Sequence, residues 1–150
     1  MNAIQLLKKD HETAKQMFAQ IEQAGPERRG QLWETLKPEL TVHEELEATA
    51  LYGPLAQERS SDEELVDWNE HHEEEVEELE AVIEEIGALD PAEAAWLEKV
   101  RELRQTLEHH IEEEEGDVWP SIERAWDGAK LEQAGQQMET LKRQMLRRAA

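Results

Sequence analysis

The 150-residue sequence has no cysteine, which excludes disulfide bonds, thiolate metal sites and cysteine-bound iron–sulfur clusters. A chain of this length corresponds to about one domain, and it can bury enough apolar surface to fold without disulfides. Any metal ion must therefore be bound through His, Asp or Glu. These ligands suit iron, manganese or zinc.

Long apolar runs are also missing. No stretch approaches the 18 or so apolar residues of a membrane-spanning helix, and residues 1–10 lack the apolar core of a signal peptide. We therefore expect a cytoplasmic protein with no membrane partner.

Basic side chains are few, because 16 Lys and Arg residues stand against 37 Asp and Glu residues, for a formal net charge of −21. Such a chain repels a phosphate backbone, so we expect no nucleic-acid partner. A short basic segment near the C-terminus is an exception, which we attribute to the preference for cations near a helix C-terminus. Its basic residues are Lys142, Arg143, Arg147 and Arg148.

Proline and glycine are scarce, at five and seven residues, and the segments between them are rich in good helix formers. Apolar residues recur at steps of three and four, and no alternating strand pattern is present. The sequence therefore predicts an all-α fold, an up-down-up-down antiparallel four-helix bundle with an additional C-terminal helix. We assign residues 1–126 to the bundle and residues 127–150 to the additional helix, as part of the same domain.

Each predicted bundle helix places a histidine in its apolar stripe, and two helices add a glutamate one turn later. A buried His or Glu costs free energy unless it is paired or binds a metal, and a spacing of four residues puts both side chains on one helix face. These positions lie at similar depths from the predicted turns, within about one helical turn, or roughly 5 Å. The sequence therefore predicts a metal site inside the bundle. Its candidate ligands are His11, His43, Glu47, His72, His110 and Glu114.

Some neighbouring residues are alternatives. His71, with Glu75 one turn later, is a rival to His72, and His109 is a rival to His110. The register of the apolar stripes favours His72 and His110. Further possible ligands are Glu44, Glu45 and Glu115.

The same residues resemble the haemerythrin-like (HHE cation-binding) domains over roughly residues 3–122. The most specific feature is a repeated His-x-x-x-Glu, each copy with an aromatic residue nine positions after the His and a proline close behind. The matching segments are Asp10-His11 with Phe18, His43-Glu44-Glu45-Leu46-Glu47 followed by Leu51-Tyr52 and Pro54, Glu70-His71-His72, and His110-Ile111-Glu112-Glu113-Glu114-Glu115 followed by Val118-Trp119-Pro120.

The resemblance implies two non-haem iron ions, joined by an oxo or hydroxo bridge. It implies the four histidines as terminal ligands and Glu47 and Glu114 as bridges. Oxygen-carrying members have two histidines one turn apart on the third helix, whereas this sequence has Trp68 and Val76 one turn from His72. That departure argues against reversible oxygen carriage.

We therefore expect a di-iron protein that binds, senses or reacts with dioxygen, peroxide or nitric oxide. One alternative is a reversible oxygen-binding or iron-storage protein without turnover, and another is an interaction protein whose polar layer is only a hydrogen-bond network. The expected partner is a small diatomic or peroxide ligand, and the chain is expected to be a monomer or weak homodimer. The sequence identifies no catalytic acid or base.

Overall fold

The computed structural model describes residues 1–149, which form five helical rods and no strand. This confirms the predicted all-α bundle with an additional helix. Two of the rods contain a π-helical turn, designated η1 and η2. The rods are α1 (Ala3–Gln23), then α2 (Pro26–Glu47) continued by η1 (Ala48–Tyr52) and α3 (Gly53–Glu58), then α4 (Glu63–Gly87), then α5 (Ala94–Glu113) continued by η2 (Glu114–Val118) and α6 (Trp119–Ala125), and finally α7 (Gly128–Ala149).

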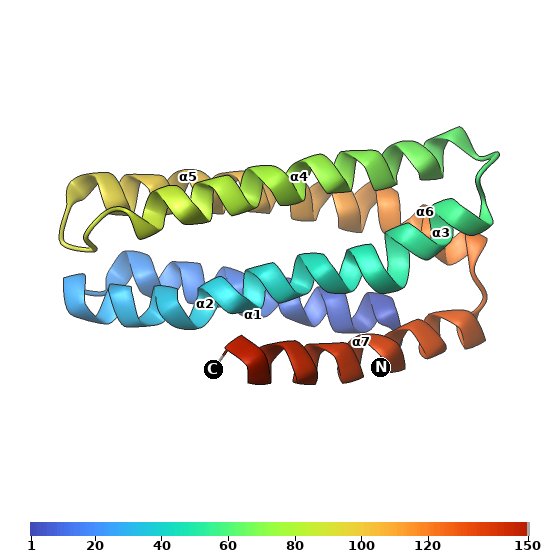
Figure 1. Ribbon diagram of the computed structural model, residues 1–150, viewed down its shortest axis with the longest axis horizontal. Coiled ribbons are helices and arrows are strands. Elements are labelled where there is room, and N and C mark those ends of the chain that lie inside the picture. The colour runs from blue at the N-terminus through green and yellow to red at the C-terminus, as the bar shows by residue number, and fades with distance from the viewer. Residues whose placement is uncertain (150) are drawn as a thin grey trace.

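The rods run lengthwise beside one another (Figure 1). Helix α1 packs on α2, and α4 packs on α5, with further contacts of α1 with α5 and of α2 with α4. Helix α7 returns along the outside of α1 and α2 and contacts both. Within residues 1–149, no helix combines the length and the apolar character needed to cross a membrane.

Local signals in the sequence set where the helices begin. The Asn2 side chain accepts a hydrogen bond from the backbone N–H of Gln5, and the Gln5 side chain accepts one from the backbone N–H of Asn2. This reciprocal capping box satisfies amide groups at the start of α1 that have no partner within the helix. Asp62 caps α4 in a similar way by accepting from the backbone N–H of Leu65.

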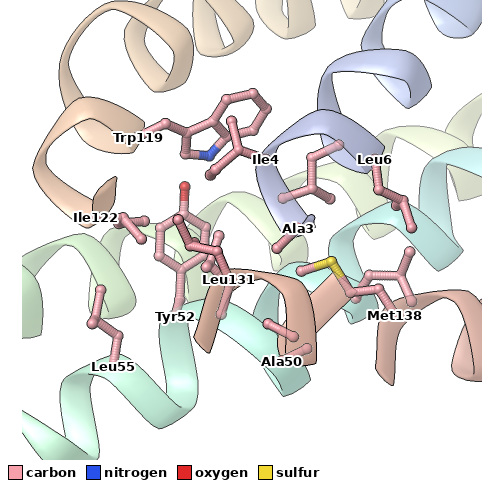
Figure 2. Close-up of a cluster of buried hydrophobic side chains, with 14 of the residues drawn as sticks. Ala3, Ile4, Leu6, Ala50, Tyr52, Leu55, Trp119, Ile122, Leu131 and Met138 are labelled. Carbon is pink, nitrogen blue, oxygen red and sulfur yellow. The ribbon is translucent and has the colours of Figure 1, made fainter. Parts of the chain in front are cut away.

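The buried apolar side chains form two separate clusters, one toward each end of the bundle. One cluster contains Phe18, Trp33 and Trp96, beside the α1–α2 and α4–α5 turns. The other joins the N-terminus of α1 to η1, α6 and α7, and includes Tyr52 and Trp119 (Figure 2). The predicted ligand positions on α1, α4 and α5 fall between these clusters, whereas on α2 His43 and Glu47 alternate with Val42 and Leu46 of the second cluster. Apolar packing thus lies on both sides of the predicted ligands along the bundle.

Helix α7 approaches the N-terminus of the chain at Gly135. A Cβ atom added to Gly135 would lie 2.8 Å from the carbonyl carbon of Asn2 and 2.9 Å from the amide nitrogen of Ala3, and closer still to the carbonyl oxygen of Met1. All three atoms belong to the backbone, so no side-chain rotation relieves the overlap. Only glycine allows α7 to sit this close to α1.

We therefore expect Gly135→Ala to destabilise the protein by about 1–3 kcal/mol, the usual cost of overpacking a close contact. Urea unfolding measures the change. Gly128→Ala is the matched control on the same helix, because its Cβ would meet nothing within 4 Å. Equal stability of the Gly135→Ala and Gly128→Ala variants would contradict the close approach of α7.

Candidate metal centre

The structure gathers the predicted ligands into one buried layer. His11 comes from α1, His43 and Glu47 from α2, and His72 from α4. His110 lies on α5, and Glu114 opens η2. The side chain of His110 is 13% exposed, and the other five residues are buried.

One group of potential ligands consists of His11, His43, Glu47 and Glu114, whose ligand atoms lie within 4.8 Å of one another. The Nε2 atoms of His11 and His43 are 3.2 Å apart. The Nε2 atom of His43 lies 2.6 Å from Oε1 of Glu47, and Nε2 of His11 lies 3.3 Å from Oε1 of Glu114. Both imidazoles therefore turn the same ring nitrogen toward the two carboxylates.

A second group consists of Glu44, Glu47 and His72, again within 4.8 Å of one another. The Nε2 atom of His72 lies 2.9 Å from Oε2 of Glu44. Glu47 belongs to both groups, so a single carboxylate joins them. His110 adjoins this arrangement, with its Nε2 atom 3.1 Å from Oε1 of Glu114.

Many of these atoms are close together without forming hydrogen bonds. Both oxygens of Glu47, both ring nitrogens of His72, Nε2 of His110 and Oε1 of Glu114 are buried and have no hydrogen-bond partner among the described residues. Buried polar atoms are nearly always hydrogen-bonded, because an unsatisfied one costs free energy. Converging side-chain nitrogen and oxygen atoms without partners are the arrangement a bound cation would satisfy. The residues therefore fit a metal centre.

In three of the histidines, a carboxylate contacts Nδ1, the ring nitrogen that faces away from the buried layer. The Nδ1 atom of His43 lies 3.0 Å from Oδ2 of Asp10. In the same way, Nδ1 of His11 lies 3.0 Å from Glu115, and Nδ1 of His110 lies 2.6 Å from Glu75. A carboxylate on the outer nitrogen fixes the tautomer and ring orientation of a metal-bound histidine.

The outer carboxylates only partly follow from the sequence. The sequence indicates Glu115 as a possible ligand and Glu75 as a partner of His71. It predicts for neither residue a contact with the outer nitrogen of a histidine ligand, and it assigns no role to Asp10. Each of the three contacts a histidine on another rod. Asp10 is adjacent to His11 in the sequence but serves His43, so the pairing depends on how the helices are rotated.

A π-helical turn follows each His-x-x-x-Glu motif. In η1 the amide N–H of Gly53 donates to the carbonyl oxygen of Ala48, and in η2 that of Trp119 donates to Glu114. Single π turns within α-helices are frequently found at functional sites. In η1 a Cβ at position 53 would lie 2.5 Å from the Ala48 oxygen, so glycine suits this turn.

The two π turns direct aromatic side chains at the ligand layer. Tyr52 donates its hydroxyl to Oε2 of Glu114 at 2.6 Å, and its ring centroid lies 4.8 Å from that of His72. The ring of Trp119 stacks on His11 with centroids 4.9 Å apart and an interplanar angle of 10°. The aromatic residues nine positions after His43 and His110 thus pack directly on the candidate ligands.

The rival residues point elsewhere. His71 is 48% exposed and lies 2.8 Å from Oε1 of Glu75, and His109 is exposed. His71, Glu75 and Glu113 form a separate group nearer the surface. Among the possible extra ligands, Glu44 joins the buried layer, whereas Glu45 is exposed and accepts a hydrogen bond from Thr49.

Burial and close charges shift the ionisation of the layer. Burial and the charge of Glu114 raise the pKa of Glu47 well above its usual value. Burial also opposes ionisation of Glu114, but contacts from Glu47, His11 and His110 hold its pKa well below its usual value. One carboxyl of the pair thus keeps a proton while the other is charged.

Two histidines, His43 and His110, also hold protons. Burial opposes the charge on His43, but Glu47 and Asp10 raise the pKa of His43 well above its usual value. Burial likewise opposes charge on His110, yet Glu114 and Glu75 raise its pKa to about 12. A cation binding in this layer must displace these protons.

These pKa shifts predict that the melting temperature depends on pH differently with and without metal. A group whose pKa is higher in the folded than in the unfolded protein stabilises the fold fully at a pH below its unfolded-state pKa. This stabilisation is lost as the pH rises from the unfolded-state pKa to the folded-state pKa. The lowered pKa values of Asp10 and Glu114 add stability that is already complete at pH 6.5. We therefore expect the melting temperature of the chelator-treated protein to fall from pH 6.5 to 9. The metal-loaded protein should not fall over this range, because metal replaces the protons.

Thermal unfolding across this pH range tests the prediction. His110→Gln should flatten the slope of the chelator-treated protein, whereas His109→Gln, at the exposed neighbour, should leave the slope unchanged. A chelator-treated protein whose stability rises with pH would show that His43 and His110 are not protonated in the folded state.

The comparisons with known proteins agree with this geometry. The sequence matches the family model for the hemerythrin HHE cation binding domain over residues 2–122. The fold is similar to the crystal structure of a hemerythrin HHE cation binding domain-containing protein from Mycobacterium kansasii, with a TM-score of 0.76, 24% sequence identity, and coverage of 97% of this chain and 87% of that chain. A search of curated proteins gave no significant match.

Proposed function

Because this chain belongs to the hemerythrin HHE cation-binding domain family, we propose that it is a non-haem di-iron protein that binds, senses or reacts with small oxidants. Dioxygen, peroxide and nitric oxide are the candidate ligands. The observation that carries the proposal is that Glu47 belongs to two adjacent groups of buried ligand atoms. A carboxylate has two oxygens, so one side chain in that position can contact two ions.

The distances suggest how the residues divide between two ions. His11 and His43, whose Nε2 atoms are 3.2 Å apart, would hold one ion. His72 and His110 would hold the other. Oε1 of Glu114 lies 3.3 Å from His11 and 3.1 Å from His110, so this carboxylate sits between the two histidine pairs. Glu47 and Glu114 are therefore the proposed bridges.

On the side of His72, helix α4 supplies no second nitrogen ligand. Trp68 and Val76 occupy the positions one turn away on α4, and the carboxylate of Glu44 lies there instead. An iron pair with oxygen-rich ligation and open positions supplies redox chemistry with small oxidants. A small pocket lined by both the exposed His71 and the buried His72 lies on this side.

The surrounding residues would shape the local environment of such a reaction. Apolar clusters enclose the layer from both ends and limit the entry of water. The hydroxyl of Tyr52 donates to Glu114 and so orients that carboxylate. Burial and the charges of Glu114 and Glu47 raise the pKa of Tyr52 well above its usual value, so the phenol keeps its proton at neutral pH.

Reconstitution with ferrous iron in the absence of air tests the proposal. We expect two irons per chain and a new near-ultraviolet or visible band when air, peroxide or nitric oxide is admitted. Removing the iron with a chelator should lower the melting temperature, since a metal bound only by the folded state stabilises it. Substoichiometric iron and no band would refute the proposal and favour a purely structural polar layer.

The shared carboxylate has its own test. Glu47→Gln keeps the size of the side chain but removes its charge, so we expect it to reduce iron content from two per chain to one or none. Glu45→Gln is the matched control, because Glu45 lies on the same helix but is exposed. If the Glu47→Gln variant still held two irons, Glu47 would not be a bridging ligand.

Sustained consumption of peroxide by the iron-loaded protein would favour turnover. A spectrum that appears with oxygen and reverses on degassing would favour a carrier without turnover.

A further inference from the structure

Helix α7 lies beyond residues 2–122, which the family model matches, yet one of its side chains reaches toward the ligand layer. The inward positions of α7 recur at steps of three and four, as in an amphipathic helix. These positions are Leu131, Ala134, Gly135 and Met138, which are buried, followed by Lys142 and Met145, which are partly buried. Leu141, Met145 and Leu146 continue the apolar stripe beyond Met138, and Lys142 is a charged residue beside them.

The ammonium group of Lys142 has a specific partner. Its Nζ atom lies 2.6 Å from Oδ1 of Asp10 on α1, and 3.7 Å from Oε2 of Glu39 on α2. The side chains of Lys142 and Asp10 are 28% and 11% exposed. A charge-assisted hydrogen bond in such a partly buried place is stronger and better ordered than an exposed ion pair.

The second carboxylate oxygen of Asp10 contacts a candidate ligand, His43. Oδ2 of Asp10 lies 3.0 Å from Nδ1 of His43, and Nε2 of His43 faces Glu47 at 2.6 Å. An unbroken chain of contacts thus runs from α7 through α1 to α2.

We propose that α7 positions the metal centre: Lys142 holds Asp10, and Asp10 holds the ring of His43 so that Nε2 points at the metal. The proposal rests on the di-iron function proposed above. It makes Lys142 a positioning residue, since it acts through Asp10 and does not itself reach the ligand atoms. Retention of metal then depends on the docking of a helix outside the four-helix bundle.

If Lys142 acted only through its charge, its removal would change metal affinity in the opposite direction from the one that a positioning role predicts. Lys142 is a cation near a cation site, so removing its charge alone would strengthen metal binding. If Lys142 acts by positioning, removing it releases Asp10 and His43, and metal binding weakens. Outer partners of metal-bound histidines typically contribute about 10- to 100-fold to metal affinity.

The experiment compares the rate at which a chromophoric chelator removes ferrous iron from the full-length protein under anaerobic conditions. We expect Lys142→Met and Asp10→Asn each to accelerate iron loss by about 10- to 100-fold. The double variant should lose iron no faster than Asp10→Asn alone, because both residues act along one path. Lys142→Arg should stay close to the wild type.

Lys130→Met is the matched control. Lys130 also lies on α7 and pairs with a carboxylate, that of Glu58, away from the ligand layer. Its substitution should leave iron loss unchanged. Iron loss from Lys142→Met at or below the wild-type rate, or additive effects in the double variant, would overturn the proposal.

A metal-independent readout separates this inference from the proposed function. In ¹⁵N NMR spectra of the chelator-treated protein, the His43 ring signals should change in Lys142→Met and not in Lys130→Met. Wild-type protein that binds no iron would defeat the proposed function, and the His43 signals would still report on Lys142. Unchanged His43 signals in Lys142→Met would defeat the positioning role.

Discussion

Two buried carboxylates that must share one small space, Glu47 and Glu114, are the constraint on which the rest of the structure depends. Two negative charges this deep in a bundle repel each other strongly, because little water remains to screen them. The charge has to be balanced by protons or by cations. The histidines around them, the carboxylates behind those histidines and the tyrosine on Glu114 all follow from this requirement. Apolar clusters on both sides limit the water around the layer, which raises the free-energy cost of any uncompensated charge.

The buried layer of histidines and glutamates could be predicted from the sequence because it uses the helical period directly. A histidine in each apolar stripe predicts an inward-facing side chain, and the structure places His72 inside and His71 outside, as the register indicates. The π turns could not be predicted in this way. A π turn shifts the register after Glu47 and Glu114, so the directions of Tyr52 and Trp119 do not follow from a period of 3.6 residues. The family match over residues 2–122 confirms the resemblance that these motifs suggested.

Contacts between residues on different helices also could not be predicted from the sequence. Lys142 was grouped with the basic segment at the C-terminus, and that interpretation was wrong, because the basic residues in the last turn of α7 are Arg147 and Arg148. Lys142 lies earlier and pairs with Asp10. Helix periodicity gives the face on which a residue lies, but which residue it meets depends on how two helices are offset and rotated. Such pairings follow from packing and not from spacing within one helix.

The two halves of the layer differ in how firmly their histidines are held. His11 and His43 each have a carboxylate on Nδ1, and Trp119 stacks on His11. On the other side Nδ1 of His72 has no hydrogen-bond partner among the described residues. A small ligand needs a coordination position that rigid side chains do not fill. In the proposed di-iron centre, the half around His72 would offer that freedom, whereas the half around His43, which Asp10 links to Lys142 on α7, would retain its ion.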